Sequence, residues 1–157
     1  MWNPFSTKET YNFEGSYSAS DIAKYVLYKC ISDKLPISNL QLQKILYYIQ
    51  RYFLQEIKRA LFKEEIEAWP FGPVVRDVYY QYCGYGALQI KDVEKPNIIL
   101  TDSEKQAIDN IIAEKRSVTP WELVEDTHQQ GHAWDMVYKD GLGYKDVIPK
   151  EVIVANG

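Results

Sequence analysis

The 157-residue chain has little of several residues on which whole classes of protein depend. It has two cysteines, Cys30 and Cys83, which are too few for a disulfide framework and fit a reduced cytosolic protein. Its longest apolar run, residues 45–49, is too short to span a membrane. The first residues have no basic region followed by an apolar stretch, so we expect no secretory signal. Together these shortages predict a cytoplasmic protein.

Positive charge is also scarce. Eighteen Lys and Arg residues stand against 22 Asp and Glu residues, which gives a net charge of −4. All of the acidic excess lies in residues 81–157, which hold 8 basic and 13 acidic side chains. An acidic chain repels phosphate backbones, so nucleic acid is an unlikely partner. The one basic cluster, between residues 51 and 63, is interrupted by glutamates, which favours a solvated helix end over a phosphate-binding patch.

Histidine is limited to His128 and His132. Their spacing is that of a helical metal pair, and Asp126 or Asp135 would be the third ligand. Gly131 lies between them, however, and neither a cysteine nor a third histidine is near in sequence. We therefore predict a structural role for the histidines and no metal.

The usual catalytic and cofactor-binding patterns are missing. Cys83 has no neighbouring base in the sequence that would activate a thiol. The Gly84–Gly86 stretch lacks the lysine and the third glycine of a phosphate-binding loop. Residues 64–67 are acidic, but exposed ion-pairing carboxylates are far commoner than catalytic pairs. The sequence predicts no cofactor and no enzyme, with a hydrolase using His128 and a nearby carboxylate as the alternative.

What the chain does have is apolar and aromatic content. Apolar residues make up 46% of it, which argues for a folded domain with a core of its own. Thirteen residues are tyrosine. Tyrosine packs well, keeps a polar tip at the surface and is enriched at protein interfaces. The surplus favours a protein-binding surface.

Periodicity and capping signals place the elements. Residues 38–53 give the clearest helix, because Ser38 and Gln41 form a capping box and Leu42, Ile45, Leu46 and Ile49 form an apolar stripe. Further helices are predicted to begin near residues 18, 73, 101, 119, 131 and 148. Short strands over 64–69 and 97–100 are candidates to pair with each other. We predict an N-terminal arm (1–17) and one α+β domain (18–157), predominantly α-helical, with a compact helical core and a small antiparallel sheet.

The most informative segment is Glu67–Tyr80, EAWPFGPVVRDVYY. Its two prolines fix φ, and Gly72 permits a positive φ or a close backbone approach. With Pro73 expected in the first turn of the following helix, the pattern predicts a rigid aromatic elbow between an extended segment and a helix. We predict that Trp69, Phe71, Arg76, Tyr79 and Tyr80 bind a protein partner, with Phe71 as an exposed anchor.

The elbow also carries a resemblance. It follows a helix reading LQKILYY (residues 42–48) and precedes Thr127-His128-Gln129-Gln130-Gly131-His132-Ala133-Trp134. These three blocks, in this order, resemble the antitoxin SocA-like Panacea domain family of phage-associated, or GepA-type, proteins. The chain departs from the family pattern at Phe71, where Tyr is frequent, and at His132-Ala133, where Ser-Pro is frequent.

The resemblance implies an antitoxin that binds a toxin encoded by the adjacent gene, or that presents this toxin to a cytosolic protease as an adaptor. It also implies that His128 is a structural polar anchor, because the Thr127-His128 pair belongs to the family pattern. Neither mechanism requires catalysis, membrane association or a cofactor. The alternatives are the hydrolase and, least favoured by the acidic charge, a DNA-binding regulator.

Overall fold

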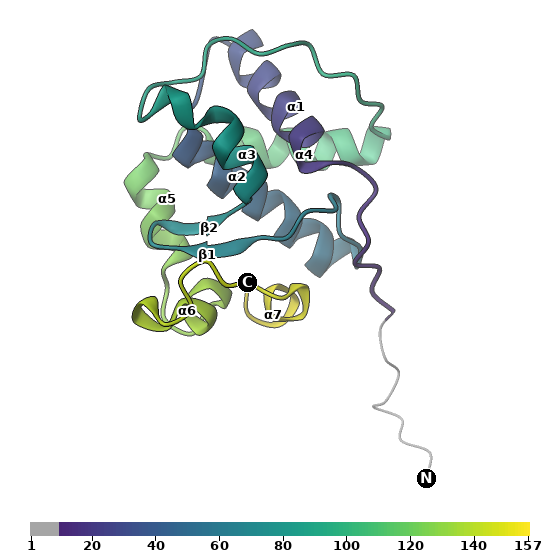
Figure 1. Cartoon of the computed structure of the whole chain (residues 1–157). Helices are drawn as coiled ribbons and strands as arrows, with labels where there is room; N and C mark the ends of the chain where they lie inside the picture. Colours follow the sequence, from purple (N-terminus) through teal and green to yellow (C-terminus); the bar gives the residue numbers. More distant parts are fainter. Residues whose placement is uncertain (1–9) are drawn as a thin grey trace.

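Helices and one two-stranded hairpin make up the described part of this protein (Figure 1). The computed structural model describes residues 10–157. Its α-helices are α1 (Ala19–Ser32), α2 (Asn39–Tyr52), α3 (Arg76–Tyr82), α4 (Asp102–Lys115), α5 (Pro120–Thr127), α6 (Ala133–Tyr138) and α7 (Lys150–Asn156), and its strands are β1 (Glu67–Trp69) and β2 (Gly72–Val74). A π-helical turn, Phe53–Ile57, extends α2, and 3₁₀ turns follow α3 (Cys83–Tyr85) and α6 (Lys139–Gly141). The predicted fold class is confirmed.

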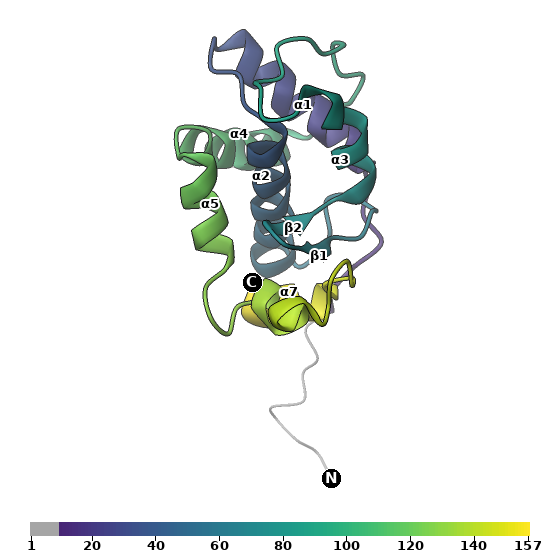
Figure 2. The same cartoon turned by 60° about the vertical axis from the view of Figure 1, so that its left-hand side comes forward.

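Helix α2 is the central element. It runs through the middle of the domain, with α4 and α5 on one side and the hairpin and α3 on the other (Figure 2). Its predicted stripe of Leu42, Ile45, Leu46 and Ile49 is fully buried, as the apolar periodicity requires. The helix therefore organises the core, because the other elements pack around it.

Helices α1, α2, α4 and α5 begin where the sequence predicts. Ser18 caps α1 by accepting the Asp21 N–H at 3.1 Å. Three more helices carry complete capping boxes, in which a hydroxyl residue and a Glu or Gln three positions later satisfy each other's backbone N–H groups: Ser38 with Gln41, Thr101 with Glu104, and Thr119 with Glu122.

The elbow, in contrast, is a β-hairpin. The prediction that Pro73 opens a helix is wrong: Pro73 lies in β2 opposite Ala68, and α3 begins at Arg76. Gly72 has a φ of +114°, which permits the tight return after Phe71. The chain then stays extended because side chains of α2 bond the backbone of β2 and of the residue after it.

The predicted strand over 97–100 is also wrong. This segment is irregular, with Ile98 and Leu100 packed against the core and Ile99 exposed, and it pairs with no strand in the described part of the chain. The outer edge of β1 is covered by residues 145–148 instead. Ala68 accepts from the Lys145 N–H at 2.7 Å and donates to the Asp146 carbonyl at 2.8 Å.

The predicted arm, residues 1–17, lies partly outside the described residues. From residue 10 on, it runs beside the segment after α2: the Asn12 N–H bonds the Lys58 carbonyl at 3.0 Å, and the Ser16 N–H bonds the Leu61 carbonyl at 3.0 Å. The boundary between arm and domain stays a prediction. No helix within residues 10–157 is long and apolar enough to cross a membrane.

Candidate partner-binding surface

Three polar side chains of α2 hold the hairpin and α3 from the inside. Lys44 Nζ donates to the Pro73 carbonyl at 2.8 Å. Gln43 Oε1 accepts from the Val75 N–H at 2.9 Å, and Asn39 Nδ2 donates to the Tyr79 carbonyl at 3.1 Å. All three are buried. Buried backbone groups must be paired, so these bonds fix the path of the chain from β2 into α3.

Lys44 is unusual because it is completely buried. Its side chain crosses Gly72: a Cβ on that glycine would lie 2.8 Å from Lys44 Cε and 2.7 Å from Thr127 Oγ1. Burial disfavours the charged ammonium and lowers the pKa of Lys44 to about 7. Only a glycine allows the hairpin to approach α2 and α5 this closely.

The C-terminal block closes over the same hairpin. The His128 ring stacks on Trp134 with centroids 3.7 Å apart, and Trp134 Nε1 donates to the Trp69 carbonyl at 2.7 Å. Burial and the nearby Lys44 lower the pKa of His128, against a raising effect of the Phe71 backbone. Among the described residues, His128 Nε2 is the buried side-chain atom without a hydrogen-bond partner. The neutral ring therefore packs between the hairpin and Trp134.

Lys44, Gly72, Thr127, His128 and Trp134 form a buried cluster beneath the hairpin. Outside this buried cluster, aromatic rings from β1 and α3 gather together. Trp69 contacts Tyr79 and Tyr80 with ring centroids 4.9 and 6.0 Å apart, and Lys145 Nζ lies 4.8 Å from the centre of the Trp69 ring. Tyr80 is 53% exposed, whereas Trp69 and Tyr79 are half-buried. The structure thus brings three of the predicted residues into one cluster.

Arg76 lies next to this cluster. Its Nε is 3.6 Å from Glu67 Oε2, and Glu67 Oε1 accepts a hydrogen bond from Trp69 Nε1 at 3.1 Å. The guanidinium is largely exposed and its pair is loose, so the charge stays accessible.

Phe71 makes its ring contact with a different element. It is 54% exposed at the hairpin tip and meets Trp121 of α5 edge to face, with centroids 5.5 Å apart. Trp121 is 62% exposed and was not among the predicted residues. A signal was present in the sequence: Trp121 is out of phase with Leu123, Val124 and Thr127, which form the buried face of α5.

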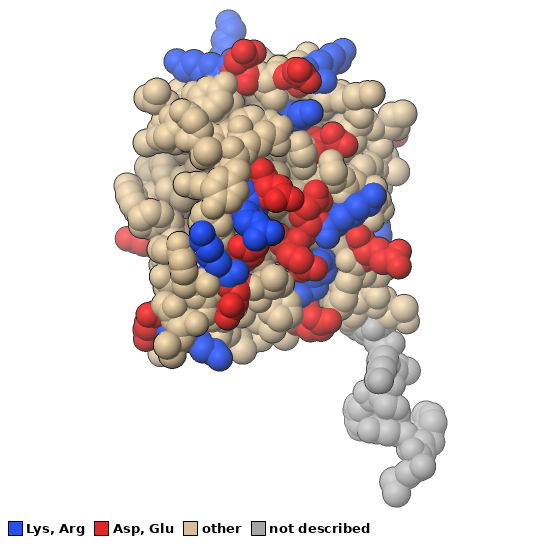
Figure 3. All heavy atoms as spheres, viewed as in Figure 1, with Lys and Arg blue, Asp and Glu red and all other residues tan. Residues whose placement is uncertain are grey.

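These aromatic residues occupy a distinct part of the surface. In Figure 3, charged side chains gather over the middle of the face, whereas the left-hand part, over the hairpin tip and α3, carries few. We call the five residues Trp69, Phe71, Tyr79, Tyr80 and Trp121 the aromatic surface. Large rigid aromatics in such a setting are typical of interface hot spots.

A family model described as "Antitoxin SocA-like, Panacea domain" matches residues 42–135, which is more than half of the chain. The chain belongs to this family. The antitoxin SocA of Caulobacter vibrioides (strain NA1000 / CB15N) is 32% identical over 133 residues, covering 78% of this chain and 71% of the relative. No solved structure matches the chain.

The buried cluster is built from the residues by which the chain resembles its family. The three sequence blocks that carry the resemblance supply its parts: the first supplies Lys44, the elbow supplies Gly72, and the last supplies Thr127, His128 and Trp134. They converge on the hairpin and hold its tip in place. The family pattern therefore coincides with the scaffold that presents Phe71.

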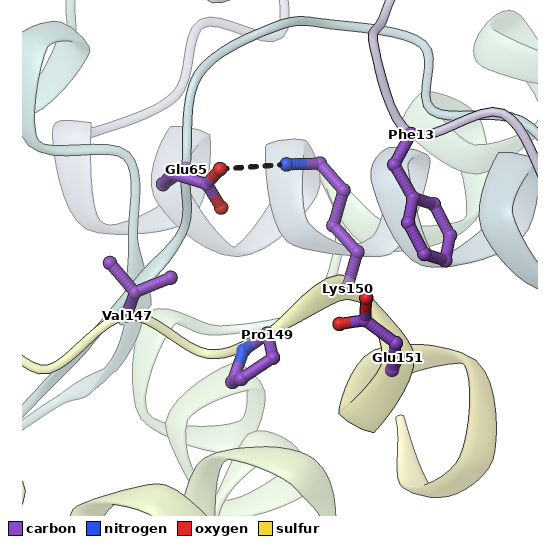
Figure 4. Close-up of a pocket in the computed structure, with 6 residues that line it drawn as sticks. All are labelled: Phe13, Glu65, Val147, Pro149, Lys150 and Glu151. Atoms are coloured by element: carbon purple, nitrogen blue, oxygen red, sulfur yellow. Dashed lines mark ion pairs between the residues drawn. The ribbon is translucent and has the colours of Figure 1, made fainter.

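A pocket of about 460 Å³ lies elsewhere, between α7 and the segment before β1 (Figure 4). The Lys150 ammonium reaches across it to Glu65 at 3.1 Å. Phe13, Val147, Pro149 and Glu151 complete the lining, so none of the described lining residues is Ser, Cys or His. Residues 10–157 also contain no group of three His, Cys, Asp or Glu side chains placed to hold a metal ion.

Proposed function

We propose that this protein is an antitoxin that neutralises a cognate toxin by binding it directly through the aromatic surface. Membership of the SocA-like family supports an antitoxin role in general. The observation that supports direct binding at this place is Phe71, a large aromatic that is 54% exposed on a turn whose backbone is fixed. A preformed anchor loses little conformational entropy on association, so more of its contact energy appears as affinity.

The predicted residues have separate parts in this proposal. Phe71 and Tyr80 are the exposed anchors, while the half-buried Trp69 and Tyr79 pack against Tyr80. Arg76 lies at the edge of the cluster, where an exposed charge guides association more than it adds affinity.

The geometry does not favour the alternative hydrolase. A general base must reach its substrate within hydrogen-bond distance or through one water. The His128 Nε2 atom is buried, and its ring lies flat against Trp134 in the scaffold beneath the hairpin. A substrate would have to displace that packing to reach it.

The test uses the toxin encoded by the adjacent gene. We expect the two purified proteins to form a stable complex and growth to be rescued on co-expression in a host lacking the cytosolic ATP-dependent proteases. Rescue that disappears without the proteases, together with a falling toxin level when they are present, would identify an adaptor. Failure to bind and failure to rescue would refute the antitoxin proposal.

The site is tested by Phe71→Ala. Loss of the anchor should weaken the complex by roughly 2 kcal/mol, about 30-fold in Kd. Tyr28→Ala removes another exposed aromatic, 38% exposed on α1, and serves as the matched control. Titration calorimetry measures both, beside a thermal melt that verifies the fold. Equal affinities for the two variants would place the interface elsewhere.

A further inference from the structure

The Phe71–Trp121 pair is a second, separate part of the aromatic surface. Its two rings come from β-hairpin and helix, and β2 packs against α5, so their edge-to-face arrangement exists before any partner arrives. An apolar side chain that inserts beside both rings meets a rigid edge. The pair therefore presents a preformed aromatic edge at the surface.

The sequence segments that carry the pair are acidic. Residues 117–138 contain four carboxylates and neither Lys nor Arg, and residues 66–75 of the hairpin contain no Lys or Arg either. Glu125 lies four residues after Trp121 and so shares its face of α5. Both side chains are exposed.

Glu125 is also the carboxylate of this helix that the chain leaves available. Glu122 accepts the Thr119 N–H at 3.1 Å in the capping box, and Asp126 accepts from the Tyr48 hydroxyl. Glu125 forms no ion pair within residues 10–157. An exposed, unneutralised carboxylate one turn from an exposed tryptophan favours an apolar group accompanied by a cation.

We propose that the Phe71–Trp121 pair docks a basic segment of the cognate toxin, with a bulky apolar side chain against the two rings and a Lys or Arg beside Glu125. The inference rests on the proposed function and specifies the chemistry of the partner. A second copy of this chain is a poor occupant, because a symmetric contact would bring the Glu125 carboxylates together. A nucleic acid is repelled by the same charges.

The experiment measures binding of the purified toxin from the adjacent gene by interferometry, at about 50 mM and about 200 mM NaCl, because screening weakens attraction between exposed charges. We expect Trp121→Ala to weaken Kd roughly 30-fold. Glu125→Lys should slow association roughly tenfold and flatten its salt dependence. Glu94→Lys makes the same charge change in the exposed loop between α3 and α4 and should stay within about twofold of the unmodified protein.

The outcomes separate this inference from the proposed function. Binding by the unmodified protein that neither Trp121→Ala nor Glu125→Lys alters, relative to Glu94→Lys, refutes the docking point and leaves the antitoxin role standing. Faster association of Glu125→Lys would mean that the toxin surface is acidic, and would likewise overturn the inference. No complex with the unmodified protein removes both proposals. Thermal melts of the three variants guard against misfolding.

Discussion

Gly72 is the residue on which the presentation of Phe71 depends most directly. Its φ of +114° is one that L side chains rarely adopt, and a Cβ there would lie 2.7 Å from Thr127 Oγ1. Two separate costs, strained backbone and steric overlap with α2 and α5, therefore oppose any substitution. The backbone conformation of Gly72 therefore determines how Phe71, the exposed anchor before it in the sequence, is placed.

We expect Gly72→Ala to reduce the free energy of unfolding by about 2–4 kcal/mol, because backbone strain and overlap act together. Chemical denaturation measures the loss. Gly84→Ala is the control, since a Cβ at Gly84 meets nothing within 4 Å and its φ is not positive. Equal stability of the two variants would contradict the tight approach of the hairpin to Lys44.

Lys44 gives the protein a stability that depends on pH. Its pKa falls from 10.5 to about 7 on burial, so between these values the unfolded chain binds a proton that the folded chain lacks. Stability should therefore rise with pH across this window, by about 1.4 kcal/mol per pH unit, and the penalty should be fully present below pH 7.

The measurement compares unfolding of the unmodified protein with Lys44→Met from pH 7 to 9.5. Methionine has a similar reach and does not titrate. This range lies above the lowered pKa of His128 and below the raised pKa values of buried tyrosines such as Tyr47, whose burial raises it to about 12. The free energy of unfolding of the unmodified protein should rise along the series relative to that of Lys44→Met. A constant difference would show that Lys44 stays charged in the folded state.

At the scale of elements, α2 carries both the core and the polar bonds to the hairpin. Its apolar stripe packs the interior, while Asn39, Gln43 and Lys44 bond backbone groups of distant segments. One helix thus combines hydrophobic burial, which is non-directional, with hydrogen bonds, which fix the register of what packs on it.

Leu46→Ala should reduce the free energy of unfolding by about 2–5 kcal/mol, because it removes a fully buried side chain and leaves a cavity. Leu88→Ala, at a leucine that is 73% exposed, should change it by less than about 0.5 kcal/mol. Guanidinium titrations of both variants provide the comparison. A mild effect at Leu46 would mean that α2 is not the centre of the core.

At the scale of the whole molecule, the C-terminal segment completes the domain. Residues 145–148 cover the outer edge of β1, and Ile148 and Ile153 are buried in the common core. Gln55 Nε2 also donates to the Ile153 carbonyl at 3.0 Å, which ties α7 to the π-helical turn that follows α2. The last residues of the chain therefore stabilise the hairpin, which lies near the middle of the sequence.

A chain ending after Leu142 should lose its cooperative melt. Losing the burial of Ile148 and Ile153 costs roughly 3–6 kcal/mol, a large part of the 5–15 kcal/mol typical of a domain. Circular dichroism and size exclusion measure the result. Leu142→Ala in the full chain, at a leucine that is 88% exposed, is the control for losing a surface apolar group. A truncated chain that melts within a few degrees of the full one would contradict this role for the segment.

The sequence by itself determined the features that depend on near neighbours along the chain. Capping boxes join residues three positions apart, and the α2 stripe repeats every three or four, so the starts of α2, α4 and α5 and the central helix itself were predictable. The ordered blocks predicted the family, and the Pro-Phe-Gly-Pro turn pointed to an exposed anchor at Phe71.

Only the tertiary structure decided which distant segments meet. The elbow is a hairpin because Lys44, 29 residues earlier, bonds the Pro73 carbonyl, and β1 pairs with residues 145–148 and not with 97–100. Trp121 joins the aromatic surface because α5 packs against β2. No local pattern contains these contacts, since they follow from filling one core around α2, where burial and backbone pairing must be satisfied by the whole chain at once.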